Sequence, residues 1–303
     1  MSVFVAEELS EVLNTKVVIG RINMGLLNRI IIDDVLLDDQ SGQEMLKVTR
    51  LSAKFDIMPF FKGKISISSV QLFGFNINLR KETPDSPPNF KFVLDAFASK
   101  DTVKKENSLD LRINSILIRR GRMSYHVLSE EETPGKFNAK HIQLQNIIAN
   151  ISLKALSKDS LNLGIKRLSL DEKASGFSLK KMSLKLVANN KQTNIDNFTI
   201  ELPETSLKLD TIHLEYDSLK AFDRFTEQVH FSFRTLPSQV TLKDISPFVP
   251  ILSHFKEPVT LDMEVKGTVD QLTCSHLEIT ADDRQFRLRG DVSLQDLSRP
   301  QDA

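Results

Sequence analysis

An eight-residue pattern of apolar and polar side chains recurs five times along the chain and constrains its fold more than any other feature. The copies are ISISSVQL from Ile65, LRINSILI from Leu111, LGIKRLSL from Leu163, LKLDTIHL from Leu207 and LTCSHLEI from Leu272. The first, third, sixth and eighth positions are apolar in every copy. Because alternate side chains of a β-strand point to opposite faces of a sheet, the pattern predicts strands with one apolar face.

Two polar residues separate the apolar pairs of each copy, which breaks strict alternation. One extra residue inside a strand, a β-bulge, would keep both pairs on the same face and increase the local bend. Two short strands that meet at a bend would have the same effect. The pattern predicts one of these two devices in each copy and leaves the choice open.

Alternation of apolar and polar side chains also fills the chain between the copies, as in Phe75 to Leu79 and Met182 to Leu186. The polar partners are charged, amide or hydroxyl side chains, so one face of each strand is expected to be wet. About 16 to 18 strands follow from the number of such segments. The expected fold class is mostly β, an elongated antiparallel sheet made of irregular repeats.

Helices are expected to be few. Residues 1–16 are expected to form an amphipathic helix, since one stripe of that segment carries Phe4, Val5, Leu9, Val12 and Leu13. Residues 17–303 are expected to form the repeating sheet, with a loop and helix excursion at about 82–108. Short covering helices are predicted in NFKFVLDAFASK, with Asn89 as its cap, and in SPFVPILSHF, with Ser246 as its cap.

Charge and cysteine usage limit the classes of partner. The 40 basic and 40 acidic side chains cancel, so no net field attracts nucleic acid, and no nucleic-acid partner is expected. The single cysteine, Cys274, occupies an apolar position of its octapeptide and is expected to be buried. No long apolar segment or signal peptide is recognisable, so as written the sequence suits a soluble protein. The opening helix nevertheless suggests a segment whose membrane anchor is missing.

Catalytic and metal-binding patterns are not recognisable, so we expect no enzyme activity, no cofactor and no metal. The acidic pairs Asp38–Asp39 and Asp282–Asp283 lie in predicted turns, where aspartate supports the local backbone. The basic clusters around Arg120 and Lys181 alternate with apolar residues, as solvated strand faces do. The six histidines have no metal-ligand spacing: His126, His141, His213, His230, His254 and His276.

An apolar sheet face of this extent must be shielded from water, and the sequence is compatible with two ways of doing so. The sheet could fold on itself as a sandwich or barrel, or it could bend into a gutter filled by an apolar ligand. The 19 Phe, 2 Tyr and no Trp supply large apolar side chains with few polar tips. This composition favours an apolar ligand over a polar one but does not exclude a dry core.

The N-terminal part of the chain carries a series of motifs in fixed order. A short helix is followed by V-x-I-G-x-I from Val17, I-x-I-x-D-V-x-L from Ile30 and L-x-A-K-x-D from Leu51. The trio Lys-Gly-Lys at 62–64 and I-x-I-x-x-V-x-L-x-G from Ile65 come next. In this order the motifs resemble the AsmA-like superfamily, and within it the TamB-type translocation and assembly module proteins. The resemblance is specific over about the first 80 residues and continues more weakly beyond them.

This resemblance implies a bent, taco-like β-groove in the periplasm of a Gram-negative bacterium, anchored in the inner membrane in the full-length protein. It implies that the groove binds phospholipid acyl chains and conducts lipids between the inner and outer membranes, without catalysis. A partner would be an outer-membrane β-barrel of the TamA or BamA type. The sequence lacks both the membrane helix and the C-terminal domain of that family, which leaves docking at the outer membrane unassigned.

Two other functions remain open. The chain could be a periplasmic scaffold that assists translocation and assembly of outer-membrane proteins by strand pairing, or a closed β-sandwich adhesion module. For the lipid function, the candidate floor of the groove consists of apolar side chains of the octapeptides and of the alternating segments next to them. They are Ile65, Ile67, Val70, Leu72, Phe75, Ile77, Ile113, Ile116, Ile118, Leu163, Ile165, Met182, Leu184, Phe198, Ile200, Leu207, Leu209, Ile212 and Leu214.

Overall fold

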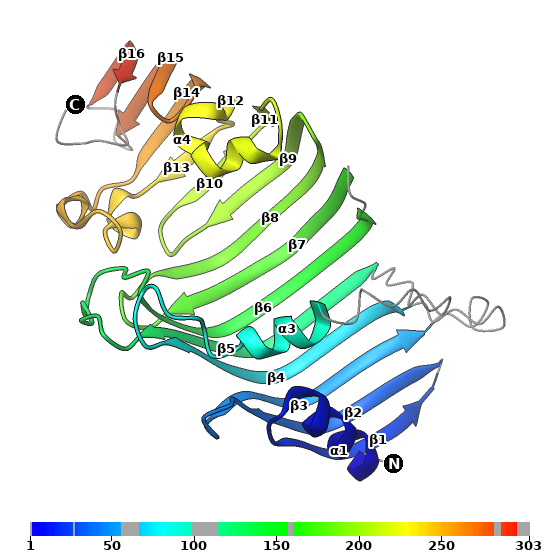
Figure 1. Ribbon diagram of the computed structural model, residues 1–303. Coiled ribbons are helices and arrows are strands. Elements are labelled where there is room, and N and C mark those ends of the chain that lie inside the picture. The colour runs from blue at the N-terminus through cyan, green and yellow to red at the C-terminus, as the bar shows by residue number, and fades with distance from the viewer. Residues whose placement is uncertain are drawn as a thin grey trace. The chain divides into compact units, whose positions relative to one another are not determined.

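A computed structural model of the chain describes residues 2–26, 28–55, 67–98, 114–156, 160–281 and 286–295. The described part is mostly β, as the alternation predicts (Figure 1). Its helices are α1 (Ser2–Leu13), α3 (Lys91–Ala98) and α4 (Phe225–Gln228), and its 3₁₀ helices are η2 (Leu219–Arg224), η3 (Leu242–Ile245) and η4 (Pro250–His254). Its strands are β1 (Val17–Gly25), β2 (Arg29–Asp38), β3 (Glu44–Phe55), β4 (Ile67–Lys81), β5 (Ser115–Val127), β6 (His141–Leu156), β7 (Ser160–Glu172), β8 (Ser178–Asn189), β9 (Gln192–Glu201), β10 (Ser206–Leu209), β11 (Ile212–Glu215), β12 (His230–Arg234), β13 (Ser238–Val240), β14 (Val259–Gly267), β15 (Gln271–Ala281) and β16 (Arg287–Gln295).

These strands form one mixed sheet of sixteen strands, with β1 to β9 paired in chain order. The prediction of an antiparallel sheet is wrong for β4 and β5, which pair in parallel. A parallel pair needs a crossover connection of a dozen or more residues. The segment from 82 to 114, which includes α3, is long enough to supply one, so the predicted excursion is also where the strand direction fails to reverse.

Two compact units make up the chain. Unit 1 comprises Met1–Asn150 and Leu170–Phe177, and unit 2 comprises Ile151–Ser169 and Ser178–Ala303. Strands β1 to β5 belong to unit 1, and strands β8 to β16 belong to unit 2. Each unit is described separately below.

The octapeptides use both of the predicted devices. In LTCSHLEI, Cys274 and Leu277 of β15 pair with Val292 and Gly290 of β16, so one extra residue lies on β15 between the apolar pairs. His276 in that segment has a φ of 56°. This confirms a bulge.

The other octapeptides can be followed to different degrees. In ISISSVQL, Ser68 is an extra residue between two register pairs, which confirms a second bulge. LKLDTIHL is instead split into the two short strands β10 and β11, which both pair with β9. LGIKRLSL lies within the single strand β7. Residues 111–113 of LRINSILI lie outside the described residues.

A second row of bends crosses the strands of unit 1 at the same level. Reading the registers from β1 to β4 places Gly20 opposite Asp34, Asp34 opposite Thr49, and Thr49 opposite Gly74. Asp34 and Gly74 have φ values of 56° and 65°, and Arg120 on β5 has a φ of 56°. Residues with a left-handed backbone conformation in the middle of a strand bend that strand. Unit 1 is therefore a sheet whose strands bend together, a feature that the octapeptide pattern alone did not predict.

Gly74 is the one position of this row where a side chain would collide with its neighbour. A Cβ atom there would lie 2.6 Å from Thr49 Oγ1, in addition to the positive φ. We expect Gly74→Ala to lower the free energy of unfolding by about 1–3 kcal/mol. Urea denaturation would measure the change, with Gly290→Ala in β16 as the control, because a Cβ at Gly290 would meet nothing within 4 Å. Equal stability of the two variants would contradict the prediction.

Helices α1 and α3 pack on the apolar face of β1 to β3 (Figure 1). The helix predicted over 1–16 is present, but its buried side differs from the predicted stripe. Ala6 is buried against β-strand residues, with Val5 and Leu13 beside it, whereas Phe4 is 64% exposed. Leu9 and Val12 are also exposed. The periodicity therefore predicted the helix but not which of its side chains contact the sheet.

The remaining predicted helices are present with shifted ends. α3 begins at Lys91, and the Asn89 side chain does not cap it but accepts a hydrogen bond from the Arg80 backbone N–H, at 3.0 Å. In SPFVPILSHF the helical segment is the 3₁₀ helix η4, which begins at Pro250 and not after Ser246. Both differences arise because proline and asparagine also suit turns, which compete with helix caps.

Candidate functional site

The predicted floor residues of β4 lie on one face of unit 1. Ile67, which precedes the bulge, and the four residues after it are each opposite an apolar residue of β3. Since paired residues share a face, the bulge keeps the apolar set together as predicted. The pairs are Ile67–Phe55, Val70–Ala53, Leu72–Leu51, Phe75–Val48 and Ile77–Leu46.

The same registers continue across the other strands of unit 1. Ile116 and Ile118 of β5 are opposite Val70 and Leu72. Five neighbouring strands, spaced by about 4.8 Å, therefore carry uninterrupted apolar rows. One row consists of Met24, Ile30, Ala53, Val70 and Ile116, and the next of Ile22, Ile32, Leu51, Leu72 and Ile118. We call these two rows the apolar face of unit 1.

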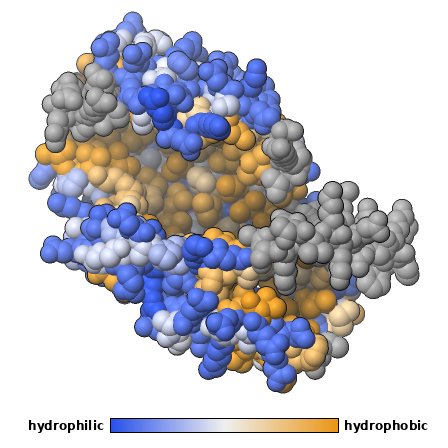
Figure 2. Space-filling view, in the orientation of Figure 1, coloured by the Kyte–Doolittle hydropathy of each residue, from blue (hydrophilic) through white to orange (hydrophobic). Residues whose placement is uncertain are grey.

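Burial divides the predicted floor of unit 1 into two classes. Phe75 is a core residue, only 8% exposed, and it packs with Val48 and Ile147. The others are partly exposed: Ile67, Val70, Leu72, Ile77, Ile116 and Ile118. Ile65 and Ile113 lie outside the described residues. Figure 2 shows hydrophobic side chains, in orange, gathered over the strands, with hydrophilic side chains, in blue, around them.

Unit 2 has an apolar face of the same kind, made of paired predicted residues. Met182 of β8 is opposite Ile200 of β9, which is opposite Leu207 of β10. Phe198 and Leu209 form the next pair. Leu209 is buried, and the other predicted residues of unit 2 are partly exposed: Leu163, Ile165, Met182, Leu184, Phe198, Ile200, Leu207, Ile212 and Leu214.

Strands β11, β12, β14 and β15 carry further apolar pairs, most of whose members were not proposed as floor. Leu214 is opposite Phe231 of β12, and Phe233 is opposite Val265 of β14. The rings of Phe231 and Phe233 stack with centroids 6.2 Å apart. Cys274 continues the Phe233 row and is buried, as predicted. Burial raises the pKa of the Cys274 thiol, which keeps it protonated and unreactive.

A mainly apolar pocket of about 370 Å³ lies at one end of this face, next to η2. Its floor includes Leu214, and its rim includes Leu219 and Phe222 of η2, both exposed. Tyr216 is buried at the pocket, where its hydroxyl group lies 2.9 Å from Thr193 Oγ1. The pocket has the character of an apolar binding site with few polar groups.

Two lining residues of this pocket, Leu186 and Ile195, were missed as floor candidates, although they pair with each other. Ile195 is out of phase with Phe198 and Ile200 because Asn197, with a φ of 53°, is an extra residue on β9. The signal was therefore present in the sequence as a second apolar offset of the octapeptide type.

The opposite face of unit 1 carries charged side chains, and two of them, Asp33 and Arg50, form an ion pair with each other. The register row there contains Arg21, Asp33, Arg50, Phe73 and Arg119. Asp33 is 5% exposed and accepts hydrogen bonds from Arg50, at 2.7 Å for the shorter one. The hydrogen bond from Arg50 and its positive charge hold the pKa of Asp33 below its ordinary value, despite burial. The ion pair with Arg50 offsets the cost of burying this carboxylate.

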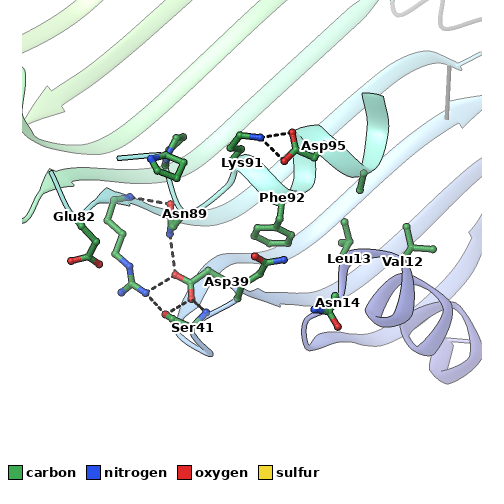
Figure 3. Close-up of a pocket in the computed structure, with 15 residues that line it drawn as sticks. Val12, Leu13, Asn14, Asp39, Ser41, Glu82, Asn89, Lys91, Phe92 and Asp95 are labelled. Atoms are coloured by element: carbon green, nitrogen blue, oxygen red, sulfur yellow. Dashed lines mark hydrogen bonds and ion pairs between the residues drawn. The ribbon is translucent and has the colours of Figure 1, made fainter. Parts of the chain in front are cut away.

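A pocket of about 680 Å³ between α1, α3 and the β2–β3 turn contains a second buried carboxylate, Asp39 (Figure 3). Its Oδ1 atom accepts backbone N–H groups of Ser41 and Gln43, at 3.0 and 3.1 Å. Its Oδ2 atom accepts hydrogen bonds from Arg80 Nη2, at 2.7 Å, and from Asn89 Nδ2, at 3.1 Å. Burial favours the neutral acid, but the hydrogen bonds from the Ser41 hydroxyl group, from Asn89 and from the backbone of Gln43 and Ser41 outweigh it and lower the pKa of Asp39. The predicted turn role of Asp38–Asp39 is thus confirmed at Asp39.

Glu172 closes the turn between β7 and β8 in the same way. The side chain is buried and accepts the backbone N–H groups of Gln143, Ala174 and Ser175. Burial opposes its ionisation, but the hydrogen bonds from Ser175 and from these backbone groups lower its pKa from 4.5. The Ser175 hydroxyl group is held by this carboxylate within the turn. We interpret the pair as structural.

Glu172→Gln is expected to lower the free energy of unfolding by about 1.5–3 kcal/mol at pH 7, since charged hydrogen bonds are lost. The pKa of Glu172 is lower in the folded state, so its contribution is present above 4.5 and is lost as the pH falls through the lowered value. The stability difference between wild type and variant should therefore narrow in acid. Urea titrations at several pH values would measure it, with Glu8→Gln on the exposed side of α1 as the control. A difference independent of pH would contradict the assignment.

No protein-family model matches the chain, and no curated protein matches it. Within the described residues, no helix has the length and apolar character needed to cross a membrane.

Proposed function

We propose that this chain binds phospholipid acyl chains along the apolar face of its sheet. The observation that supports the proposal is the uninterrupted rows of paired apolar side chains in each unit, most of which are partly exposed. A closed core of this size would bury such rows. Large exposed apolar surfaces are rare in soluble proteins and mark binding sites.

The energetics favour a long-chain ligand. Each buried methylene group contributes about 0.8 kcal/mol, so a chain of about fifteen methylenes gains roughly 12 kcal/mol on leaving water. A head group would stay at the hydrophilic margin and would need no deep polar pocket. A lipid could then move along the rows without full exposure to water.

The proposed biological role follows from the family resemblance. The sheet would be a segment of a bent, taco-like groove of the TamB and AsmA type, in the periplasm of a Gram-negative bacterium. The full-length protein would be anchored in the inner membrane and would conduct lipids toward an outer-membrane β-barrel partner, with no catalysis. The bends at Asp34, Gly74 and Arg120 support a curved sheet in unit 1.

The test is to express the chain in a Gram-negative periplasm, record its mass under native conditions, and analyse extracted lipids. Stoichiometric phospholipid on a folded protein is the expected result. A folded protein that carries no lipid and takes up no labelled lipid would overturn the proposal.

If the protein is instead an assembly scaffold, it should bind extended peptides and carry no lipid. Among the described strands, β16 pairs only with β15 and therefore has a free edge. If that edge recruits extended peptides, a fluorescent β-strand peptide should bind while lipid does not.

A further inference from the structure

Two histidines, fifteen residues apart in the sequence, meet where β5 ends and β6 begins. His126 is the penultimate residue of β5, and His141 is the first residue of β6. Their Nδ1 atoms are 3.0 Å apart. His141 is 6% exposed, whereas the His126 side chain is 24% exposed. One imidazole is thus fixed in the protein, and the other faces partly toward solvent.

Hydrogen bonding determines where the His141 lone pair points. His141 Nε2 lies 2.9 Å from the backbone oxygen of Glu130, which can only accept, so His141 carries its proton on Nε2. In the neutral ring, Nδ1 of His141 therefore carries no proton, and its lone pair faces Nδ1 of His126. Histidine ligands in metal sites commonly show this arrangement, with the remote N–H bonded to a carbonyl oxygen.

A third donor comes from the loop that joins the two strands. Glu132 Oε1 lies 3.9 Å from His126 Nδ1, and the carboxylate is 62% exposed. Lys140 of that loop pairs with Glu130, at 2.6 Å. One donor atom each from His126, Glu132 and His141 lie within 4.8 Å of one another.

The spacing of these atoms fits one metal ion. Zinc bonds of about 2.0–2.1 Å in a tetrahedral site place two ligand atoms about 3.3 Å apart. The observed separations, 3.0 Å between the two nitrogen atoms and 3.9 Å from His126 to Glu132, lie on either side of that value. For His126 to bind through Nδ1, its proton moves from Nδ1 to Nε2, so the neutral pair releases no net proton.

We propose that His126, His141 and Glu132 bind a divalent transition metal, with Zn²⁺ as the tested ion and solvent in the fourth position. Two imidazoles and one carboxylate are a donor set suited to Zn²⁺. The site departs from the expectation that the chain binds no metal, which rested on sequence spacing alone. It lies in unit 1 and is independent of the apolar face.

The loop that supplies Glu132 is already ordered by its own contacts. The backbone N–H of Val127 donates to Lys140 O at 2.9 Å, and the side chain of Asn138 donates to Glu131 O at 3.1 Å. Gly135 N–H reaches Ala174 O at 2.9 Å. A metal ion would therefore meet donors held near their binding positions and would connect the ends of β5 and β6 with this loop.

The experiment is a calorimetric titration of the chelator-treated chain with Zn²⁺, repeated with Co²⁺ to record the visible spectrum. One equivalent of metal and intense tetrahedral Co²⁺ bands are expected. We expect His126→Ala to weaken binding by more than about 100-fold and Glu132→Gln by about tenfold or more. Both positions are partly exposed, so these variants should fold, as circular dichroism would verify.

His213→Ala is the matched control, because His213 Nε2 also lies near a carboxylate, at 3.0 Å from Glu215 Oε1, but His213 belongs to no group of three possible metal ligands among the described residues. Its binding should equal that of wild type. The proposal is overturned if wild type binds no Zn²⁺, or if His126→Ala and Glu132→Gln bind it as tightly as wild type.

Discussion

Phe75→Ala is expected to lower the free energy of unfolding by about 3–5 kcal/mol, the range for aromatic residues truncated in a core. Phe75 is 8% exposed and packs with Val48 and Ile147. Its ring also fills the space beside Gly121, where a Cβ atom would lie 2.4 Å from two ring carbons. A site packed this closely cannot collapse fully around an alanine, so a cavity remains.

Urea denaturation followed by circular dichroism would measure the loss. Phe73→Ala is the matched control: it lies two residues away on the opposite face, is 38% exposed, and contacts Arg120, whose guanidinium carbon is 5.1 Å from the ring centroid. Its truncation should cost about 1 kcal/mol, the size of an exposed cation–π contact. Equal losses in the two variants would show that Phe75 is not a core residue.

Ile116→Asp is expected to abolish lipid occupancy while the protein stays folded. Ile116 is partly exposed and is opposite Val70 in the apolar face of unit 1. A carboxylate there can remain hydrated in the lipid-free protein, but an acyl chain laid over it would strip that water, at a cost of several kcal/mol. Lipid should therefore be excluded and the fold kept.

Native mass spectrometry and circular dichroism must be applied to the same sample. Leu117→Asp is the control, because Leu117 is the next residue of β5, is also partly exposed, and is opposite Gln71 on the other face. If Ile116→Asp unfolds the chain while Leu117→Asp does not, the face is a sealed core. Lipid retained by a folded Ile116→Asp would contradict the acyl-chain assignment.

Strand periodicity was the most informative signal in the sequence, for a physical reason. A bulge at Ser68 shifts the phase of alternation and is therefore visible as two polar neighbours. The bend at Gly74 also shifts the phase, between Leu72 and Phe75, but two polar neighbours do not mark it because Phe73 is apolar. The buried side of α1 was also not predictable from the sequence. Ala6 contacts the sheet and Phe4 does not, and this depends on how closely the helix packs on the strands.

For the candidate site, too, one property could be predicted from the sequence and another could not. The spacing predicted which residues share the apolar face, and the paired registers place Val70, Leu72, Ile116 and Ile118 together in unit 1 and Met182, Ile200 and Leu207 together in unit 2. Whether each is core or partly exposed could not be predicted, because burial depends on residues distant in sequence. Phe75 is buried by Ile147, and Leu209 is buried although Leu207 beside it is partly exposed.

By itself, the sequence predicted that this protein is mostly β, that its strands have one apolar face, and that a bulge or break interrupts the octapeptides, which the registers show for ISISSVQL, LKLDTIHL and LTCSHLEI. These properties are local, since they follow from side chains a few residues apart. Only the tertiary structure decided that β4 and β5 run parallel and that His126 meets His141 across a hairpin end. Pairing direction and side-chain clusters depend on how connecting segments cross the sheet, which local periodicity does not encode.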